Sequence, residues 1–476
     1  MNAHSASSPV PASTSRGAER PRVLISAAHK SSGKTTLTLG LAAALVARGH
    51  VVQPFKKGPD YIDPLWHSMA AGRSCYNLDF HMMARAEIDA CFTAASAGAR
   101  ISLIEGNKGL YDGLDLDGSN SNAALAKQLA APVVLVIDAR GMTRGVAPLI
   151  LGYQAFDPDV RIAGVILNQL GGSRHESKLR AVIEYYTSVP VIGAVQYDES
   201  LRIAERHLGL VPANEAGAAR ARIAAVGEKV AAQVDLARLL ALADAAPDWR
   251  SKAPAPPAGN RGERVRIAIA QDAAFGFYYG EDLDALVAAN AELVPFDTLN
   301  DPALPEADGL VIGGGFPEMF MRELSANAPL RAAIKAAIEA GLPTYAECGG
   351  LMYLSKSLSW NGQTRDMVGV VPGDTVMHAR PVGRGYARLA PSGDDPWAER
   401  DVIPAHEFHY SSLDGLPADS RYAYRVERGH GIDGRNDGYL AHNLLAAYVH
   451  RRGAGAQGWI TPFLNQVRTR RALRAA

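Results

Sequence analysis

The sequence is poor in the features that mark secreted, membrane-embedded and nucleic-acid-binding proteins. It has three cysteines, Cys75, Cys91 and Cys348, whose number and spacing fit neither a disulfide framework nor a zinc motif, so we expect a reducing, cytoplasmic compartment. It contains no run of about 18 apolar residues that could span a membrane. Neither charge is in excess, with 49 Lys and Arg against 49 Asp and Glu, which argues against general binding to nucleic acids or membrane surfaces.

The length and composition instead describe a folded chain with more than one domain. Its 476 residues exceed what one hydrophobic core usually serves, and 47% hydrophobic against 21% charged residues is typical of globular proteins. Residues 1–21 are small and polar and lack the apolar segment of a signal peptide, so they predict a flexible extension. Residues 246–264 hold four prolines and two glycines, and they predict a linker between domains at residues 22–245 and 265–476.

Both predicted domains alternate short apolar segments with helical patterns. Residues 22–28 and 51–55 predict strands on either side of a helix at residues 35–48, which is a βαβ unit and therefore part of a parallel sheet. Further strands are expected at residues 101–105, 132–138, 161–168 and 189–195 in the first domain, and at 265–270, 293–296, 309–312 and 342–345 in the second. The sequence thus predicts a doubly wound α/β domain followed by a second α/β domain.

A phosphate-binding loop is predicted where the first strand meets its helix. Backbone N–H groups and a helix N-terminus would face an anion at Gly33, Lys34, Thr35 and Thr36. Lys34 would reach the β- and γ-phosphates and the Thr35 hydroxyl would bind Mg²⁺, so ATP and Mg²⁺ are implied. Ala28 replaces the first glycine of the motif, and an ordinary helix start is the alternative, but the flanking strand and helix favour the loop.

Three acidic residues follow predicted strands of the same domain: Asp60, Glu105 and Asp112. Because the carboxyl ends of parallel strands meet at one edge of a sheet, we expect these carboxylates to lie beside the phosphate loop. Oxygen atoms of Thr35, Asp60 and Glu105 would hold Mg²⁺, whereas a turn or cap role is the alternative for each acid taken alone. Asn168, at the end of a later strand, is predicted to contact the nucleotide base.

A nucleophilic thiol is predicted in the second domain. Cys348 lies between an expected strand and a helix start and is followed by two glycines, as in the turns that expose a nucleophile. Gly314, Gly315 and Gly349 offer N–H groups for an oxyanion hole. The alternative for a lone cysteine is a small buried hydrophobe. A histidine base is needed, and spacing alone leaves five candidates open: His378, His406, His409, His442 and His450.

Several long segments, taken in order, resemble those of the cobyrinate a,c-diamide synthase family. They are the phosphate loop, KKGPDYIDP, EGNKGLYDG and ERHLGL in the first domain, followed by AECGGLMYL and HEFHYS in the second. The resemblance runs from about residue 22 to about residue 465. It implies a phosphate-loop amidoligase domain related to dethiobiotin synthetase, followed by a class I glutamine amidotransferase domain.

The resemblance also implies roles for individual residues. Cys348 matches the glutaminase nucleophile and His450 matches the histidine that activates it. Three consecutive residues would meet a tetrapyrrole carboxylate: Asp60, Tyr61 and Ile62. Two acids would serve metal binding and catalysis: Glu105 and Asp112. The implied reaction is ATP-dependent amidation of the a and c side-chain carboxylates of a corrinoid tetrapyrrole, through an acyl phosphate, with ammonia taken from L-glutamine.

Departures from the family pattern leave the exact substrate open. The phosphate loop has few glycines, Asn107 and Lys108 stand inside the EGNKGLYDG segment, and Arg452 replaces a second histidine two residues after His450. Cobyrinate or hydrogenobyrinate is the first expectation, and sirohaem or sirohydrochlorin is the second. Cobyric acid synthase activity, or a non-enzymatic phosphate-loop switch protein with an inactive glutaminase-like domain, is a weaker alternative. The oligomeric state, a homodimer included, and the role of the cluster from His406 to His409 stay open.

Overall fold

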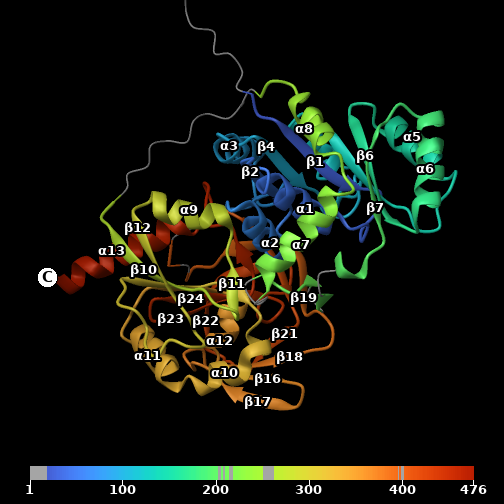
Figure 1. Cartoon of the computed structure of the whole chain (residues 1–476). Coiled ribbons are helices and arrows are strands. Elements are labelled where there is room, and N and C mark those ends of the chain that lie inside the picture. The colour runs from blue at the N-terminus through green and yellow to red at the C-terminus, as the bar shows by residue number, and fades with distance from the viewer. Residues whose placement is uncertain are drawn as a thin grey trace, which may run out of the picture.

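The computed structural model of the chain describes residues 19–201, 205–206, 209–213, 218–249, 262–394, 396–397 and 401–475. Figure 1 shows two α/β bodies that touch each other, the first coloured blue to green and the second yellow to red. The predicted α/β fold class is confirmed, since each body is built on a sheet with parallel strands and flanking helices. Most of the predicted extension at residues 1–21, most of the predicted linker at 246–264, and His207 and Leu208 of the ERHLGL segment lie outside the described residues.

A seven-stranded sheet, in which every pairing is parallel, forms the centre of the first body. The strand order is β3-β2-β4-β1-β5-β6-β7. The strands are β1 (Arg22–Ala27), β2 (Val52–Lys57), β3 (Tyr76–Leu78), β4 (Ile101–Glu105), β5 (Val133–Asp138), β6 (Ile162–Leu170) and β7 (Val191–Gln196). The strands predicted from the sequence all appear here, whereas β3 has only three residues and therefore too little periodicity to be recognised.

Helices cover both faces of this sheet, which explains why its strands are continuous apolar runs (Figure 1). They are α1 (Lys34–Val46), α2 (Ile62–Ala71), α3 (Arg85–Ala95), α4 (Asn122–Gln128), α5 (Val146–Phe156), α6 (Ser173–Tyr186), α7 (Ala219–Ala231) and α8 (Leu236–Asp244). A short 3-10 turn, η1 (Glu199–Leu201), and the small pair β8 (Glu205–Arg206) and β9 (Gly209–Leu210) follow β7. Helix α1 packs closely against α7, because a Cβ atom at Gly40 would lie 2.5 Å from Cγ2 of Val230.

The second body contains a ten-stranded sheet of order β12-β10-β13-β15-β24-β23-β22-β19-β20-β25. Its parallel part is β10 (Val265–Ala270), β12 (Ala291–Phe296), β13 (Gly309–Ile312), β15 (Thr344–Glu347) and β24 (Leu444–Ala447). Its antiparallel part is β19 (Gly383–Pro391), β20 (Ile403–His409), β22 (Arg421–Arg428), β23 (Asn436–Ala441) and β25 (His450–Arg451). The sequence predicted the first four parallel strands but did not reveal the antiparallel part.

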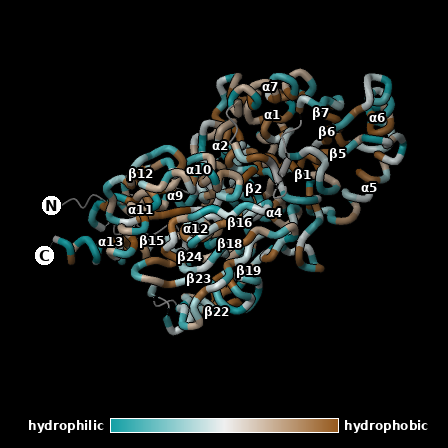
Figure 2. The backbone as a smooth tube through the Cα atoms, turned by 90° about the horizontal axis from the view of Figure 1, so that it is seen from below, coloured by the Kyte–Doolittle hydropathy of each residue, from teal (hydrophilic) through white to brown (hydrophobic). Residues whose placement is uncertain are grey.

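Smaller elements complete the second body. Its helices are α9 (Gly280–Ala288), α10 (Met321–Ala326), α11 (Ala328–Glu339), α12 (Gly349–Leu354) and α13 (Ile460–Ala475), with the 3-10 turn η2 (Pro317–Phe320). Strand β11 (Phe275–Phe277) pairs with β14 (Gly314–Gly315), and a separate sheet joins β17 (Gln363–Asp366), β16 (Ser357–Trp360), β18 (Asp374–Met377) and β21 (Ser411–Asp414). Figure 2 shows hydrophobic and hydrophilic segments interleaved along both bodies. Within the described ranges, no helix has the length and apolar character that crossing a membrane requires.

The two bodies are held together by side chains of β3, of the loop that follows it and of α3. Tyr76 donates a hydrogen bond to Asp284 of α9. Nε2 of His81 lies 3.0 Å from the carbonyl oxygen of Ala387 on β19. Glu87 of α3 forms an ion pair of 3.1 Å with Arg452, which follows β25. The loops after β2 and β3 therefore face the second body.

Candidate active site

Cys348 occupies the sharp turn between β15 and α12. Its φ angle is 47°, a value that side chains other than glycine rarely adopt, and its N–H donates a 2.7 Å hydrogen bond to the carbonyl oxygen of Ala447. The turn is possible because glycines follow: a Cβ atom at Gly350 would lie 2.2 Å from the carbonyl oxygen of Ile312. Such a turn presents a side chain to a cavity while backbone N–H groups surround it, which suits a nucleophile.

His450 is the histidine that the fold brings to this thiol. Its ring hydrogen-bonds Cys348, and its Nδ1 atom lies 3.2 Å from Oε2 of Glu347. Burial acts to lower the pKa of His450, but the adjacent Cys348 and Glu347 outweigh burial and raise it to about 10. The result is a buried Cys348–His450–Glu347 row in which the imidazolium form is favoured. Spacing alone left five histidines open, and the geometry agrees with the one that the family resemblance indicated.

Glu347 is a member of this row that the sequence reasoning missed. Its Oε1 atom accepts hydrogen bonds from the Tyr345 hydroxyl at 2.5 Å and from the Arg451 N–H at 2.9 Å. These bonds leave Oε2 directed at His450. The available signal was its place directly before Cys348 in AECGGLMYL. The alternation of side chains along a strand does not predict that Glu347 contacts a histidine 103 positions away.

The three glycines predicted for an oxyanion hole surround the same residues. A Cβ atom at Gly314 would lie 2.7 Å from Cε1 of His450, and one at Gly349 would lie 2.9 Å from the backbone nitrogen of Gly315. No side chain larger than hydrogen fits at these positions without displacing the turn. The glycines thus let β14 approach the thiol closely, and their role as oxyanion donors stays a prediction.

The predicted phosphate loop joins β1 to α1 as expected. Gly33 stands at the N-terminus of α1 with φ of 87°, and Lys34 begins the helix and is 7% exposed. Burial lowers the pKa of Lys34 to about 8, although the nearby Glu105 carboxylate acts in the opposite direction. Asn168 donates a 2.9 Å hydrogen bond to the carbonyl oxygen of Ser32, so it braces the loop. Its predicted contact with a nucleotide base stays a prediction, as do the phosphate contacts of Thr36.

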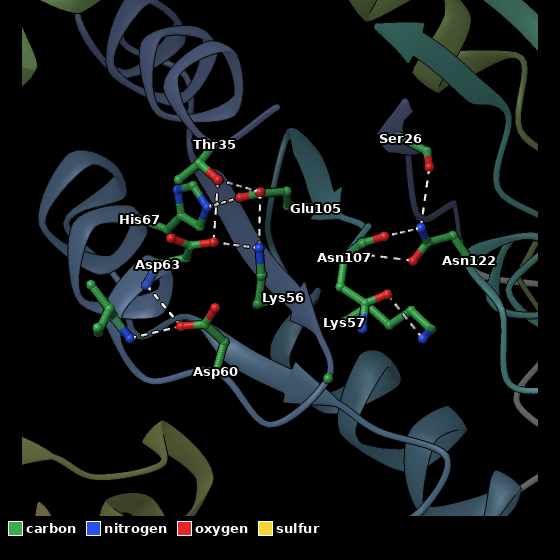
Figure 3. Close-up of polar contacts among 12 residues, drawn as sticks. Ser26, Thr35, Lys56, Lys57, Asp60, Asp63, His67, Glu105, Asn107 and Asn122 are labelled. Atoms are coloured by element: carbon green, nitrogen blue, oxygen red, sulfur yellow. Dashed lines mark hydrogen bonds and ion pairs between the residues drawn. The ribbon is translucent and has the colours of Figure 1, made fainter. Parts of the chain in front are cut away.

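A buried cluster of charges lies beside this loop (Figure 3). Glu105, at the end of β4, is fully buried and accepts hydrogen bonds from Lys56 at 2.9 Å and from Thr35 Oγ1 at 2.7 Å. His67 pairs with its other oxygen. Asp63 contacts the same Lys56 and lies 3.2 Å from Thr35 Oγ1. Burial acts to raise the pKa of Glu105, but Lys56 and His67 outweigh it and hold the pKa well below its usual range.

Three members of this cluster were not assigned from the sequence: Lys56, Asp63 and His67. Lys56 and Asp63 belong to the segment KKGPDYIDP, and His67 follows Asp63 by four residues on α2, so the two share one face of that helix. The spacing of these three residues was therefore visible in the sequence, but the burial of their side chains was not. Without burial, a lysine and an aspartate in a loop are more often surface residues.

The oxygen atoms of Thr35, Asp63 and Glu105 fit the preference of Mg²⁺ for hydroxyl and carboxylate ligands. Within the described part of the chain, no group of three or more His, Cys, Asp and Glu side chains is arranged to hold a metal ion. A cation here would therefore draw its further ligands from phosphate oxygens and water. Asp60 has another partner set: its Oδ1 accepts the N–H groups of Ile62 at 2.8 Å and Asp63 at 3.1 Å, at the start of α2. Its metal role stays a prediction.

The loop after β4 is shaped by its own polar contacts. Asp112 Oδ2 accepts the N–H of Gly109 at 2.9 Å. Asn122, a buried residue that the sequence reasoning did not single out, donates to the carbonyl oxygens of Asn107 and Gly109, the latter at 2.7 Å. Figure 3 shows this amide beside Ser26 of β1. The loop is thereby fixed at the carboxyl edge of the sheet, with Asp112 facing a cavity.

One cavity of about 930 Å³ is lined by both bodies. Residues of the first body on its wall include Lys57, Asp60, Tyr61, Ile62, Lys108 and Asp112. Residues of the second body include Gly315, Cys348, Arg384, His406, Arg428 and His450. The predicted substrate residues and the predicted glutaminase residues thus share a single space.

An aromatic cluster lies where the two sets of residues meet. Tyr61 stacks on Phe277 with ring centroids 5.6 Å apart and on Tyr279 at 4.4 Å. The Tyr279 hydroxyl lies 3.1 Å from Nδ1 of His406, whose ring stacks on that of His450 at 4.9 Å. Burial, with the charge of His450 next, holds the pKa of His406 well below its usual range, so this ring is neutral.

Comparisons with known proteins agree with this two-part arrangement. A family model described as "CobQ/CobB/MinD/ParA nucleotide binding domain" matches residues 24–211, and one described as "CobB/CobQ-like glutamine amidotransferase domain" matches residues 266–455. The chain is 48% identical over 454 residues to a cobyrinate a,c-diamide synthase of Magnetococcus marinus, covering 93% of this chain and 96% of the relative. It is 45% identical over 469 residues to the protein of that name from Methanosarcina acetivorans, covering 91% and 92%.

Proposed function

The chain belongs to the cobyrinate a,c-diamide synthase family of glutamine-hydrolysing ligases, and on that premise we propose that it amidates the a and c carboxylates of cobyrinate or hydrogenobyrinate. The observation that carries the proposal is the shared cavity, in which Cys348 and His450 face the same space as Asp60 and Asp112. The nucleotide-binding body activates the carboxylate, and the amidotransferase body supplies nitrogen. The glutamine-hydrolysing residues and the acceptor-binding residues would then share one cavity, through which ammonia can reach the acceptor.

Ammonia is released at Cys348. The thiolate attacks the side-chain carbonyl of glutamine, and the C–N bond breaks as the His450 imidazolium donates its proton to the leaving nitrogen. A thioester of glutamate remains. Water then attacks this thioester, giving up a proton to His450, and glutamate leaves with the thiolate restored. Glu347 holds the imidazole in the orientation that both steps need, and the N–H groups near Gly315 and Gly349 stabilise the oxyanion.

The acceptor carboxylate is activated at the phosphate loop. Its oxygen attacks the γ-phosphorus of ATP, forming an acyl phosphate and releasing ADP. Lys34 neutralises charge on the transferred group, and Asp60, Tyr61 and Ile62 position the acceptor. Ammonia attacks the acyl carbon, phosphate leaves, and one proton is lost as the amide forms. A bound Mg²⁺ would supply further charge neutralisation of the phosphates, and Thr35, Asp63 and Glu105 are the residues whose oxygens would hold it.

The cavity also supports the proposal that ammonia passes directly between the two reactions. Ammonia in bulk water near neutral pH is mostly ammonium, which has no lone pair for attack. The wall between the sites carries Tyr61, Phe277 and the neutral ring of His406, and these groups offer ammonia little opportunity for protonation. Separate, solvent-open sites would lose most of the nucleophile.

The decisive experiment supplies the purified enzyme with ATP, Mg²⁺ and glutamine carrying heavy nitrogen in its amide. Cobyrinate, hydrogenobyrinate, sirohydrochlorin and sirohaem are offered in parallel, and mass spectrometry counts the labelled amides. We expect two labelled amides on cobyrinate or hydrogenobyrinate, with one ADP released for each. Turnover of only sirohydrochlorin or sirohaem would move the substrate assignment to that ring class. Glutamine hydrolysis without incorporation into any of the four would refute the proposed function.

A further inference from the structure

The antiparallel part of the second sheet presents one face to the shared cavity. Arg384 stands opposite Phe408 and Tyr386 opposite His406 in the β19–β20 pairing, and His406 stands opposite His450 in the β20–β25 pairing. Directly opposed residues of an antiparallel pair project from the same face, as do alternate residues along a strand. All five side chains therefore share one face, and all five line the cavity. The glutaminase histidine and Arg384 belong to one continuous wall.

Tyr386 fixes this wall against the first body. Its hydroxyl donates a hydrogen bond to Asp79, and its ring stacks on His81 with centroids 4.4 Å apart. His81 also contacts the carbonyl oxygen of the next residue, Ala387, at 3.0 Å. Since Arg384 lies two residues before Tyr386 on the same face of β19, its position relative to Asp60 and the phosphate loop is set by these contacts.

Two arginines on this wall form no ion pair with any residue that the structure describes. The guanidinium of Arg384 lies 5.3 Å from the ring centroid of Phe408, which orients it along the cavity. Arg428, at the end of β22, also lines the cavity. Within the ranges that the structure describes, neither arginine is in an ion pair. By contrast, Arg388 stands directly opposite Arg428 in the sheet, pairs with Glu427 at 3.5 Å and does not line the cavity.

The one carboxylate close to Arg384 on the neighbouring strand is already satisfied. Glu407 accepts the N–H groups of His430 and of Gly431, at 2.6 and 2.9 Å, and it lies 3.5 Å from His409. Burial acts to raise the pKa of Glu407, but these hydrogen bonds outweigh it and lower the pKa, so the carboxylate is ionised and held away from Arg384. The arginine charge is thus free for a ligand.

We propose that Arg384 and Arg428 bind carboxylates of the polycarboxylate acceptor, so that the glutaminase body completes the acceptor site of the ligase body. This rests on the proposed function. The opposite wall carries three further cations, Lys57, Arg85 and Lys108, beside the carboxylates of Asp60, Asp112 and Asp115. An acceptor with several carboxylates keeps negative charge on the side chains that are not being amidated, and guanidinium groups bind such carboxylates through two parallel hydrogen bonds. The acceptor therefore contacts both bodies and covers the shared cavity on the side where Arg384 lies.

The test compares Arg384→Gln, Arg428→Gln and the double variant with Arg388→Gln as the matched control from the same sheet face. Cobyrinate is the acceptor and ammonium chloride the nitrogen donor, so that glutamine is absent. Each single variant should raise KM for cobyrinate about tenfold, because a charge-assisted hydrogen bond is lost, and the double variant should raise it further. Arg384→Lys should recover part of the binding. The control should match the wild type.

Glutamine hydrolysis by the same variants tests the alternative that these arginines bind the α-carboxylate of glutamine and not a carboxylate of the acceptor. If Arg384 or Arg428 bound the α-carboxylate of glutamine, KM for glutamine would rise while KM for cobyrinate stayed constant, and the inference would be wrong. Retained glutamine hydrolysis also shows that a variant is folded. Unchanged KM for cobyrinate in the double variant would overturn the inference alone. A wild-type enzyme that amidates no tetrapyrrole would instead refute the proposed function, and the inference with it.

Discussion

The ring of Tyr61 packs against the ring of His450 with their centroids 5.0 Å apart, although the two residues belong to different bodies. Tyr61 stands in the loop between β2 and α2, directly after Asp60, and His450 begins β25. The histidine of the Cys348–His450–Glu347 row is therefore held on one side by the first body. The Asp60–Ile62 segment, which we propose to bind the acceptor, therefore contains the residue that contacts His450.

Replacing Tyr61 should affect both stability and glutamine hydrolysis. Tyr61→Ala removes a buried ring and should lower the free energy of unfolding by about 3–5 kcal/mol, as other large aromatic truncations do. It should also lower kcat/KM for glutamine hydrolysis without acceptor, because His450 loses the ring that packs against it. Tyr61→Phe keeps the ring and should cost only about 1 kcal/mol for the lost hydroxyl contact. Denaturant unfolding and glutamate release measure the two effects. Wild-type glutamine hydrolysis by a folded Tyr61→Ala protein would contradict the coupling.

Removing the thiol should separate the two nitrogen sources. Cys348→Ala should abolish amidation driven by glutamine yet leave amidation driven by ammonium salts, because only the release of ammonia needs the thiol. Cys91→Ala is the matched control, since burial raises the pKa of that thiol and keeps it protonated, and it should retain both routes. Product formation with each donor is measured by mass spectrometry. If ammonium salts do not rescue Cys348→Ala, the division into two reactions is wrong.

Removing the lysine of the phosphate loop should stop both routes. Lys34→Ala should eliminate amidation with glutamine and with ammonium salts alike, since neither nitrogen donor can react before the acceptor is phosphorylated. ADP release in the presence of acceptor measures that step directly. Glutamine hydrolysis without acceptor serves as the check that the variant is folded. Amidation by ammonium salts that survives in Lys34→Ala would sink the phosphate-loop assignment.

The glutaminase step should have an alkaline limit that depends on Glu347. The pKa of His450 is raised from an ordinary value of 6.5 to about 10. Stability contributed by this imidazolium is therefore fully present below about pH 6.5 and is lost as the pH rises through about 10. Glu347→Gln removes one of the two neighbours that raise the pKa of His450, so the alkaline limb of kcat/KM for glutamine should move to lower pH. A pH profile of glutamate release in both proteins tests this, and coincident alkaline limbs would exclude the role of Glu347.

Much of the first body could be predicted because its information is local. The apolar run at residues 101–105 coincides with β4, and the Gly33–Thr36 motif could be placed because a strand and a helix flank it within a few residues. Cys348 could be singled out for the same reason, since its turn is encoded by the glycines beside it. In each case the residues that determine the structure are neighbours in sequence.

The remaining features depend on pairings between distant segments. Strand β19 lies beside both β20 and β22, and its register sets Arg384 opposite Phe408, yet no short pattern specifies which strands pair. Glu347 meets His450 only because β15 ends where β25 begins, beside the same turn. The Lys56–Glu105 pair could not be recognised because burial, rather than residue type, distinguishes it from a surface ion pair.

The φ angle of 47° at Cys348 lowers the stability of the fold at the position where the proposed glutamine hydrolysis needs a side chain. A residue with a Cβ atom held in that conformation costs on the order of 1–3 kcal/mol, which glycine would not incur. Cys348→Gly should therefore raise the melting temperature while ending glutamine hydrolysis. The conformation that holds the thiol at the cavity therefore lowers the stability of the turn that carries it.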